Sequence, residues 1–172
     1  DLDLIKTFPS PMVSWSVNSL DEGCREDMDK AVPMERRLAA MEKFHAEGVR
    51  TTCFISPIFP GITDVIEIVE RVKGCCDYIW LENLNLRGSF KSDIMRYIAE
   101  KHAELLPLYE DIYNRGNMTY WQLLDEEVAR YAEENGLEYV IDKEPVLRKT
   151  EGKPTIINYF YHSKIKQSAK RK

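Results

Sequence analysis

The sequence predicts an α/β fold: the C-terminal half of a partial (βα) TIM-like barrel with parallel strands, plus extra C-terminal helices. One pattern runs three times along the chain: an apolar strand, a polar turn, a helix, a glycine and the next strand. Such alternation is typical of parallel sheets. A complete barrel needs roughly 250 residues, whereas these 172 residues offer four or five strands. We therefore expect half to two-thirds of a barrel, with the other strands preceding Asp1.

Each element has a local reason. Apolar runs rich in β-branched and aromatic residues predict strands, and Pro33, Gly48, Gly74 and Gly136 mark where helices begin or end. The expected strands cover residues 12–17, 49–56, 78–81, 137–141 and 155–160. The expected helices cover residues 33–48, 64–73, 92–106 and 119–135. Pro107 kinks or restarts the third helix, and Thr119 with Gln122 matches a capping box for the fourth.

Composition limits the class of protein. The chain is 44% hydrophobic and 31% charged with a net charge of −5, which indicates a globular domain and gives nucleic-acid binding no general electrostatic support. No apolar run has the length of a membrane span, and no signal peptide is visible. We expect a cytoplasmic protein without membrane contact. It would have one α/β domain over residues 1–160, truncated at its N-terminus, and a basic tail over residues 161–172.

The four cysteines do not form a recognisable metal motif. They are Cys24, Cys53, Cys75 and Cys76, and no two of them have CxxC or CxxxC spacing. A zinc or iron–sulfur site built from this segment alone is therefore not expected. Reduced, mostly buried thiols fit the sequence better.

Polar residues gather where each of the first three strands ends, which is where ligands bind in parallel α/β folds. Each group also has a structural explanation: an ordinary turn for the first, a proline-shaped turn for the second, and an ion pair between Glu82 and Arg87 for the third. The groups are Ser16, Asn18 and Ser19; Ser56, Pro57 and Ile58, followed by Pro60 and Gly61; and Glu82, Asn83, Asn85 and Arg87.

Residues 13–87 resemble the radical S-adenosylmethionine enzymes. The closest likeness is to the spore-photoproduct-lyase-like subgroup, often called DNA repair photolyase-like. The matching text is Val-Ser-Trp-Ser-Val-Asn-Ser, an Arg-Leu pair opening a helix that ends in Glu-Gly-Val, Ser-Pro-Ile-Phe-Pro-Gly-Ile-Thr-Asp, and Trp-Leu-Glu-Asn-Leu-Asn-Leu-Arg-Gly. By this likeness they are the fourth, fifth and sixth strands of a partial (βα)6 barrel.

The resemblance implies roles for individual residues. Ser16 and Asn18 would contact the ribose or methionyl end of S-adenosylmethionine, and Arg37 its carboxylate, with Arg36 as an equally placed competitor. Three further roles follow from the resemblance. The adenine would pack on Ser56, Pro57 and Ile58. The cofactor would also be bound by Glu82 and Asn83, and the substrate by Asn85 and Arg87.

The family's CxxxCxxC loop, which holds a 4Fe–4S cluster, does not occur in this sequence. Either the cluster ligands lie outside this chain, upstream in a longer protein, or this chain is a relative without a cluster. No cofactor is expected on the chain alone. The whole enzyme would take one electron from a donor such as flavodoxin or ferredoxin. It would cleave S-adenosylmethionine reductively to methionine and a 5′-deoxyadenosyl radical.

The substrate is left open. The subgroup likeness suggests nucleic acid, and the aromatic residues 159–161 beside His162 could stack on bases. Two alternatives belong to other classes. One is a non-catalytic α/β interaction module, and the other is a different βα-barrel enzyme with Glu82 as its acid or base.

Overall fold

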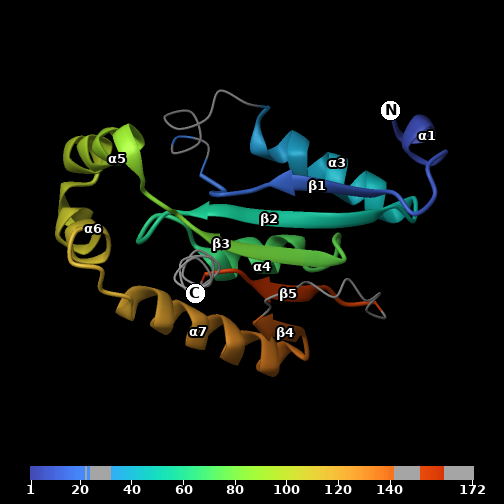
Figure 1. Cartoon of the computed structure of the whole chain (residues 1–172). Coiled ribbons are helices and arrows are strands. Elements are labelled where there is room, and N and C mark those ends of the chain that lie inside the picture. Colours follow the sequence, from blue (N-terminus) through green and yellow to red (C-terminus); the bar gives the residue numbers. More distant parts are fainter. Residues whose placement is uncertain (22, 24–31, 142–151, 161–172) are drawn as a thin grey trace, which may run out of the picture.

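A five-stranded parallel sheet forms the centre of the computed structural model (Figure 1), which describes residues 1–21, 23, 32–141 and 152–160. Every neighbouring pair of strands is parallel, as the alternating pattern predicts, and the order is β1-β2-β3-β5-β4. The edge strands are therefore β1 and β4. The strands are β1 (Met12–Ser16), β2 (Arg50–Ile58), β3 (Tyr78–Asn83), β4 (Glu138–Ile141) and β5 (Thr155–Asn158).

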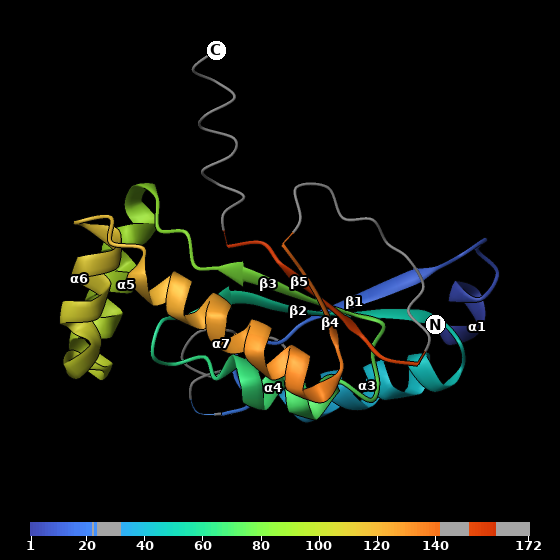
Figure 2. The same cartoon turned by 90° about the horizontal axis from the view of Figure 1, so that it is seen from below.

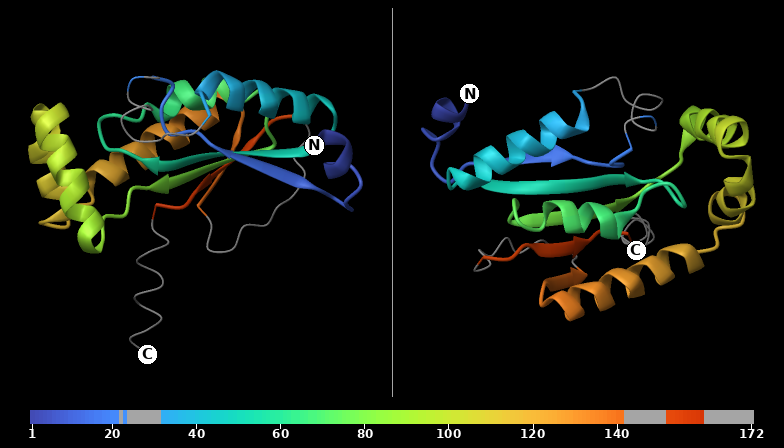
Figure 3. Two further views of the ribbon diagram at one scale, coloured as in Figure 1. Left: turned by 90° about the horizontal axis from the view of Figure 1, so that it is seen from above. Right: turned by 180° about the vertical axis from the view of Figure 1, so that it is seen from behind.

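The helices are distributed unevenly around this sheet. Three of them, α3, α4 and α7, lie against one face (Figures 2 and 3), whereas α5 and α6 stand beyond the carboxyl ends of the strands. The helices are α1 (Leu2–Ile5), α3 (Met34–Ala46), α4 (Val65–Val72), α5 (Gly88–Lys101), α6 (Leu106–Tyr113) and α7 (Thr119–Asn135), with the 3-10 turn η1 (Ala103–Leu105) before α6.

The main core lies between the sheet and these three helices. Side chains alternate along a strand, so Cys53 and Ile55 of β2 and Ile79 and Leu81 of β3 point to the same face. All four are fully buried there. Helix α4 shows why the packing works, since its apolar positions recur at helical spacing and form one buried stripe. They are Val65, Ile68, Val69 and Val72.

The opposite face carries no helix within the described parts of the chain (Figure 3, left). The register lines its side chains up in rows across the strands. One row comprises Ser14, Thr52, Tyr78, Thr155 and Glu138, and the next comprises Ser16, Phe54, Trp80, Ile157 and Val140. We call this side the open face and the other the helix face.

Several expected boundaries need correction. Helix α5 begins at Gly88, and β3 runs on to Asn83 rather than ending at residue 81. The capping box is wrong, because α7 begins at Thr119 itself and the Asn117 side chain accepts the Thr119 N–H at 2.9 Å. Pro107 restarts the chain as α6, and Gly136 ends α7 in the left-handed conformation, both as predicted.

The order of the last two strands departs from the sequential order of a TIM-like barrel, because β5 lies between β3 and β4. The α/β class with parallel strands is confirmed, whereas the half barrel stays a prediction. The basic tail, His162, Cys24 and most of the loop between β4 and β5 lie outside the described residues.

Candidate functional site

The carboxyl ends of β1, β2 and β3 meet at one end of the open face. Ser56 and Glu82 lie 26 residues apart in sequence, yet Ser56 Oγ donates to Glu82 Oε2 at 2.8 Å. The Val17 N–H donates to the Phe54 carbonyl at 2.7 Å, which extends the β1–β2 ladder beyond Ser16. Asn18 follows at a bend after β1. The sheet thus brings two of the predicted side chains, those of Ser56 and Glu82, into contact at one edge.

An aromatic surface lies beside this polar row. The rings of Phe54 and Trp80 stack at 5.6 Å with an interplanar angle of 16°, and the Tyr159 ring lies 5.5 Å from Trp80. All three side chains are half-buried. Tyr159 is one of the aromatic residues that the sequence suggests for base stacking, whereas no sequence motif assigns Phe54 or Trp80 to the site. The sequence signal for them is alternation: Phe54 and Trp80 each lie between two buried residues of their strand, so they point to the other face of the sheet.

Two buried polar atoms on the open face have no hydrogen-bond partner among the described residues. They are Thr52 Oγ1 and Trp80 Nε1. A buried donor or acceptor left unpaired costs about 1–3 kcal/mol. Native proteins rarely leave such groups without an explanation. The open face therefore carries two hydrogen-bonding groups that the described side chains around them do not pair.

Arg37 lies next to the end of β1. Its Nη1 donates to the Ser16 carbonyl at 3.0 Å and its Nε donates to the Val32 carbonyl at 2.9 Å. Arg36 is exposed and lines the same hollow beside β1. The two main-chain bonds hold the Arg37 guanidinium at this strand end, which distinguishes it from Arg36.

The other predicted residues are placed less favourably. Ile58 is fully buried in the core, and its carbonyl accepts the Leu84 N–H, while Pro57 follows a cis peptide bond and is half-buried. Asn83 is paired in the ladder opposite Ile58. Ser19 is buried, and its hydroxyl accepts the Asp21 N–H.

The ion pair between Glu82 and Arg87, the structural alternative for this group, does not form. Glu82 is exposed and bonds to Ser56, whereas Arg87 Nε donates to Asn85 Oδ1 at 3.1 Å on the loop that leads to α5. The physical reason is that β3 continues through Glu82, so the side chain projects from the sheet towards its neighbour in β2. Asn85 and Arg87 contact each other rather than the polar row.

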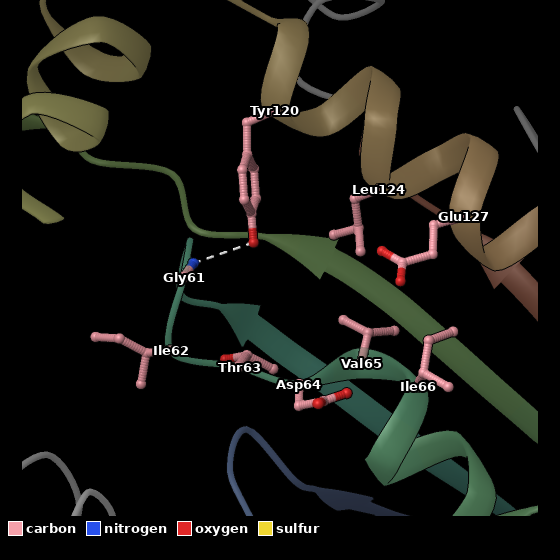
Figure 4. A pocket seen from close by; sticks show the side chains of 9 residues that line it. All are labelled: Gly61, Ile62, Thr63, Asp64, Val65, Ile66, Tyr120, Leu124 and Glu127. Atoms are coloured by element: carbon pink, nitrogen blue, oxygen red, sulfur yellow. Dashed lines mark hydrogen bonds between the residues drawn. The ribbon is translucent and has the colours of Figure 1, made fainter.

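The turn after β2 is held by two side chains that the sequence analysis did not assign to the site (Figure 4). The Gly61 N–H donates to Tyr120 Oη of α7 at 3.1 Å. Burial raises the pKa of the Tyr120 hydroxyl, so that oxygen is neutral at neutral pH. Thr63 Oγ1 accepts the Phe59 N–H at 3.0 Å and donates to the Asn18 carbonyl at 2.8 Å. No local sequence signal indicates either long-range contact.

The described cysteines do not fit an iron–sulfur cluster. Cys53, Cys75 and Cys76 are free and buried, and burial raises the pKa of each thiol. A cluster ligand must be a thiolate. In the parts of the chain that the structure describes, no group of three histidine, cysteine or acidic side chains could hold a metal ion.

No helix within the described ranges combines the length and the apolar character that crossing a membrane requires.

Comparison with known proteins finds relatives whose printed names describe them only as uncharacterized. The chain is 30% identical over 116 residues to protein MJ0683 of Methanocaldococcus jannaschii, which covers 67% of this chain and 43% of the relative. It is 28% identical over 118 residues to protein Rv2578c of Mycobacterium tuberculosis and to protein Mb2609c of Mycobacterium bovis, which covers 63% of this chain and 35% of each relative.

No family model matches the chain, and no solved structure does. The chain spans less than half the length of these curated relatives. The chain is therefore similar to one part of several longer proteins.

Proposed function

We propose that this chain is the C-terminal part of a radical S-adenosylmethionine enzyme and supplies part of the wall that holds the cofactor. The observation that carries the proposal is the contact between Ser56 and Glu82 at the carboxyl ends of β2 and β3, on the open face of a parallel sheet. Hydroxyl and carboxylate oxygens placed there suit the hydroxyls of a ribose. The resemblance of residues 13–87 supplies the identity of the ligand.

Arg37 adds a second point of support. Its guanidinium is fixed beside the end of β1 by bonds to two carbonyls, at 2.9 and 3.0 Å. A guanidinium in that position suits the methionyl carboxylate, because its planar N–H groups can bind both oxygens. Asn18, half-buried at the same strand end, would contact the ribose or the methionyl group.

A half barrel is consistent with the same features. Helices cover one face of the sheet, as they cover the outside of a barrel, and the other face has unpaired buried polar atoms. The relatives are more than twice as long as the region they share with this chain, which leaves room for further strands. On this proposal the open face becomes the inner wall of the complete protein.

When bound, S-adenosylmethionine supplies a carbon-centred radical that abstracts hydrogen, after one electron reaches its sulfonium group. The described thiols do not fit the cluster that would deliver this electron, so its ligands belong to a part of the protein outside this chain. The residues of this chain bind and orient: Ser56 and Glu82 at the sugar, Arg37 at the carboxylate. The electron donor would be a flavodoxin or ferredoxin, and nucleic acid is the candidate substrate class.

The first test is made on the full-length protein from the native gene, purified without oxygen. The proposal expects a CxxxCxxC loop upstream of the matched region, a brown preparation and a 4Fe–4S absorption spectrum. Addition of dithionite and S-adenosylmethionine should release methionine and 5′-deoxyadenosine. A full-length sequence without the loop, or a colourless protein after iron reconstitution, would refute the assignment.

The second test uses two adjacent arginines. Arg37→Ala should weaken binding of S-adenosylmethionine to the full-length protein by about tenfold or more, the effect of losing a charged hydrogen bond. Arg36→Ala is the matched control, because it removes the same charge one residue away, where the side chain is exposed. If both variants bind S-adenosylmethionine with equal affinity, Arg37 does not contact the cofactor.

One observation favours a second candidate, a barrel enzyme that uses Glu82 for proton transfer. Glu82 is exposed at a strand end, where Ser56 Oγ donates to its carboxylate. Acid or base catalysis requires such an accessible carboxylate. This candidate predicts turnover by a full-length protein that binds no iron, and complete loss of turnover in Glu82→Gln.

A further inference from the structure

We propose that Thr63 is a positioning residue that ties the turn after β1 to the turn after β2, and so sets the spacing of the cofactor site. Its single hydroxyl makes two bonds in opposite senses. It donates to the Asn18 carbonyl at 2.8 Å and accepts the Phe59 N–H at 3.0 Å. Asn18 and Thr63 are 45 residues apart, so the bond joins two segments that the chain itself does not hold together. This inference rests on the proposed function.

The hydroxyl is well suited to this task. Thr63 is only 7% exposed, and the Phe59 backbone beside it is also buried. Water therefore does not readily replace the bond to Phe59, whereas the bond to Asn18 is partly buried. The Thr63 N–H donates to the Phe59 carbonyl at 3.0 Å, so Thr63 and Phe59 are joined twice. A threonine, with χ1 restricted by its branched Cβ, holds the hydroxyl between these two partners.

The hydroxyl is not needed to begin the helix that follows. Thr63 precedes α4, and a threonine before a helix usually serves as its cap. Here the cap is Asp64, whose Oδ1 accepts the Glu67 N–H at 2.8 Å. The two bonds of Thr63 lead away from α4, to the segments that follow β1 and β2. Asp64 therefore caps α4, and helix capping does not explain the side chain of Thr63.

The two turns that Thr63 joins follow strands that carry the candidate site. Asn18 is itself a candidate contact, and its carbonyl is the acceptor. Phe59 follows Ser56, Pro57 and Ile58, and the Ser56 hydroxyl bonds to Glu82. Loss of the Thr63 hydroxyl would leave the strands in place but release the Asn18 turn from the Phe59 turn. Because correct placement of binding groups is worth large factors in affinity and rate, a small separation of the two turns should be measurable.

The test measures binding of S-adenosylmethionine and S-adenosylhomocysteine to the full-length protein by calorimetry. Thr63→Val keeps the shape and removes both bonds, and it should raise both dissociation constants by about tenfold, as expected for the loss of one well-placed contact. Thr63→Ser restores the hydroxyl and should bind within about twofold of the wild type. Asp64→Ala is the matched control at the next residue. It removes the α4 cap and should lower the melting temperature while leaving affinity unchanged.

Hydrogen exchange of the ligand-free wild type provides a measurement that needs neither a variant nor a bound cofactor. The Phe59 amide should exchange as slowly as the amides of central β2. In Thr63→Val, should it fold, residues 59–63 and 18–21 should exchange faster together, whereas in Asp64→Ala they should not.

The outcomes separate the two ideas. A wild-type protein that binds neither compound refutes the proposed function, while slow exchange at Phe59 would still support the Thr63 bridge. A wild type that binds, with Thr63→Val binding equally well, overturns the positioning role. Rapid exchange at Phe59 in the wild type overturns the bridge itself.

Discussion

The two faces of this sheet are built from alternate residues of the same strands, yet they differ in what they leave unsatisfied. On the helix face, Ile79 and Leu81 are fully buried against α4 and the other covering helices. On the open face, the intervening Trp80 has a buried N–H without a partner among the described residues, and Glu82 is exposed. The helix face therefore forms the main core, whereas the exposed polar side chain lies on the open face, at the carboxyl end of β3.

Substitutions at two adjacent residues of β3 test the difference between the two faces most strongly. Leu81→Ala should lower the free energy of unfolding by about 2–5 kcal/mol, because it leaves a cavity in the core. Glu82→Gln should change it by less than about 0.5 kcal/mol, as expected for an exposed site. Urea denaturation of both variants measures the difference. Similar losses in the two would mean that the open face is as tightly packed as the core.

The cysteines of the helix face make stability depend on alkaline pH. Burial raises the pKa of the Cys53 and Cys76 thiols above the ordinary value of 9.0. Above pH 9 the unfolded chain loses these protons while the folded chain keeps them, so unfolding becomes more favourable as the pH rises. The expected loss is about 1.4 kcal/mol per pH unit for each thiol.

Cys53→Val provides the control for this prediction, because it keeps an apolar side chain at the position and cannot ionise. Its unfolding free energy should fall less steeply above pH 9 than that of the wild type. Parallel curves from pH 9 to 10.5 would show that Cys53 is not protected in the folded state.

The start of α7 offers a smaller test, in which sequence and structure disagree. The sequence indicates a capping box of Thr119 and Gln122, whereas the Asn117 side chain accepts both the N–H and the hydroxyl of Thr119. Asn117→Ala should therefore lower stability by about 1 kcal/mol, the usual value of a cap. Gln122→Ala should have almost no effect. Thermal melting of both variants decides between the two arrangements.

The features that could be predicted from the sequence are those that repeat along it. Alternating strands and helices indicate a parallel sheet, and parallel strands bring their carboxyl ends to one edge. The meeting of Ser56 and Glu82 follows from that rule, although the two are 26 residues apart. Arg37 lies beside the end of β1, and its role at the cofactor stays a prediction.

The features that could not be predicted depend on geometry that no local pattern encodes. The bond from Thr63 to the Asn18 carbonyl requires both turns to be folded first. The position of β5 between β3 and β4 is equally hidden, because β4 and β5 are both four-residue strands with β-branched residues. The pairing of Glu82 with Ser56 rather than Arg87 depended on how far β3 extends.

The most direct test of the central claim maps ligand protection on the full-length protein. Hydrogen exchange is measured with and without S-adenosylhomocysteine, a stable analogue of the proposed cofactor. We expect protection at residues 16–19, 56–63 and 82–83, at the carboxyl ends of β1, β2 and β3, and none along α7. Protection confined to the helices of the other face, or no protection at a saturating concentration, would contradict it.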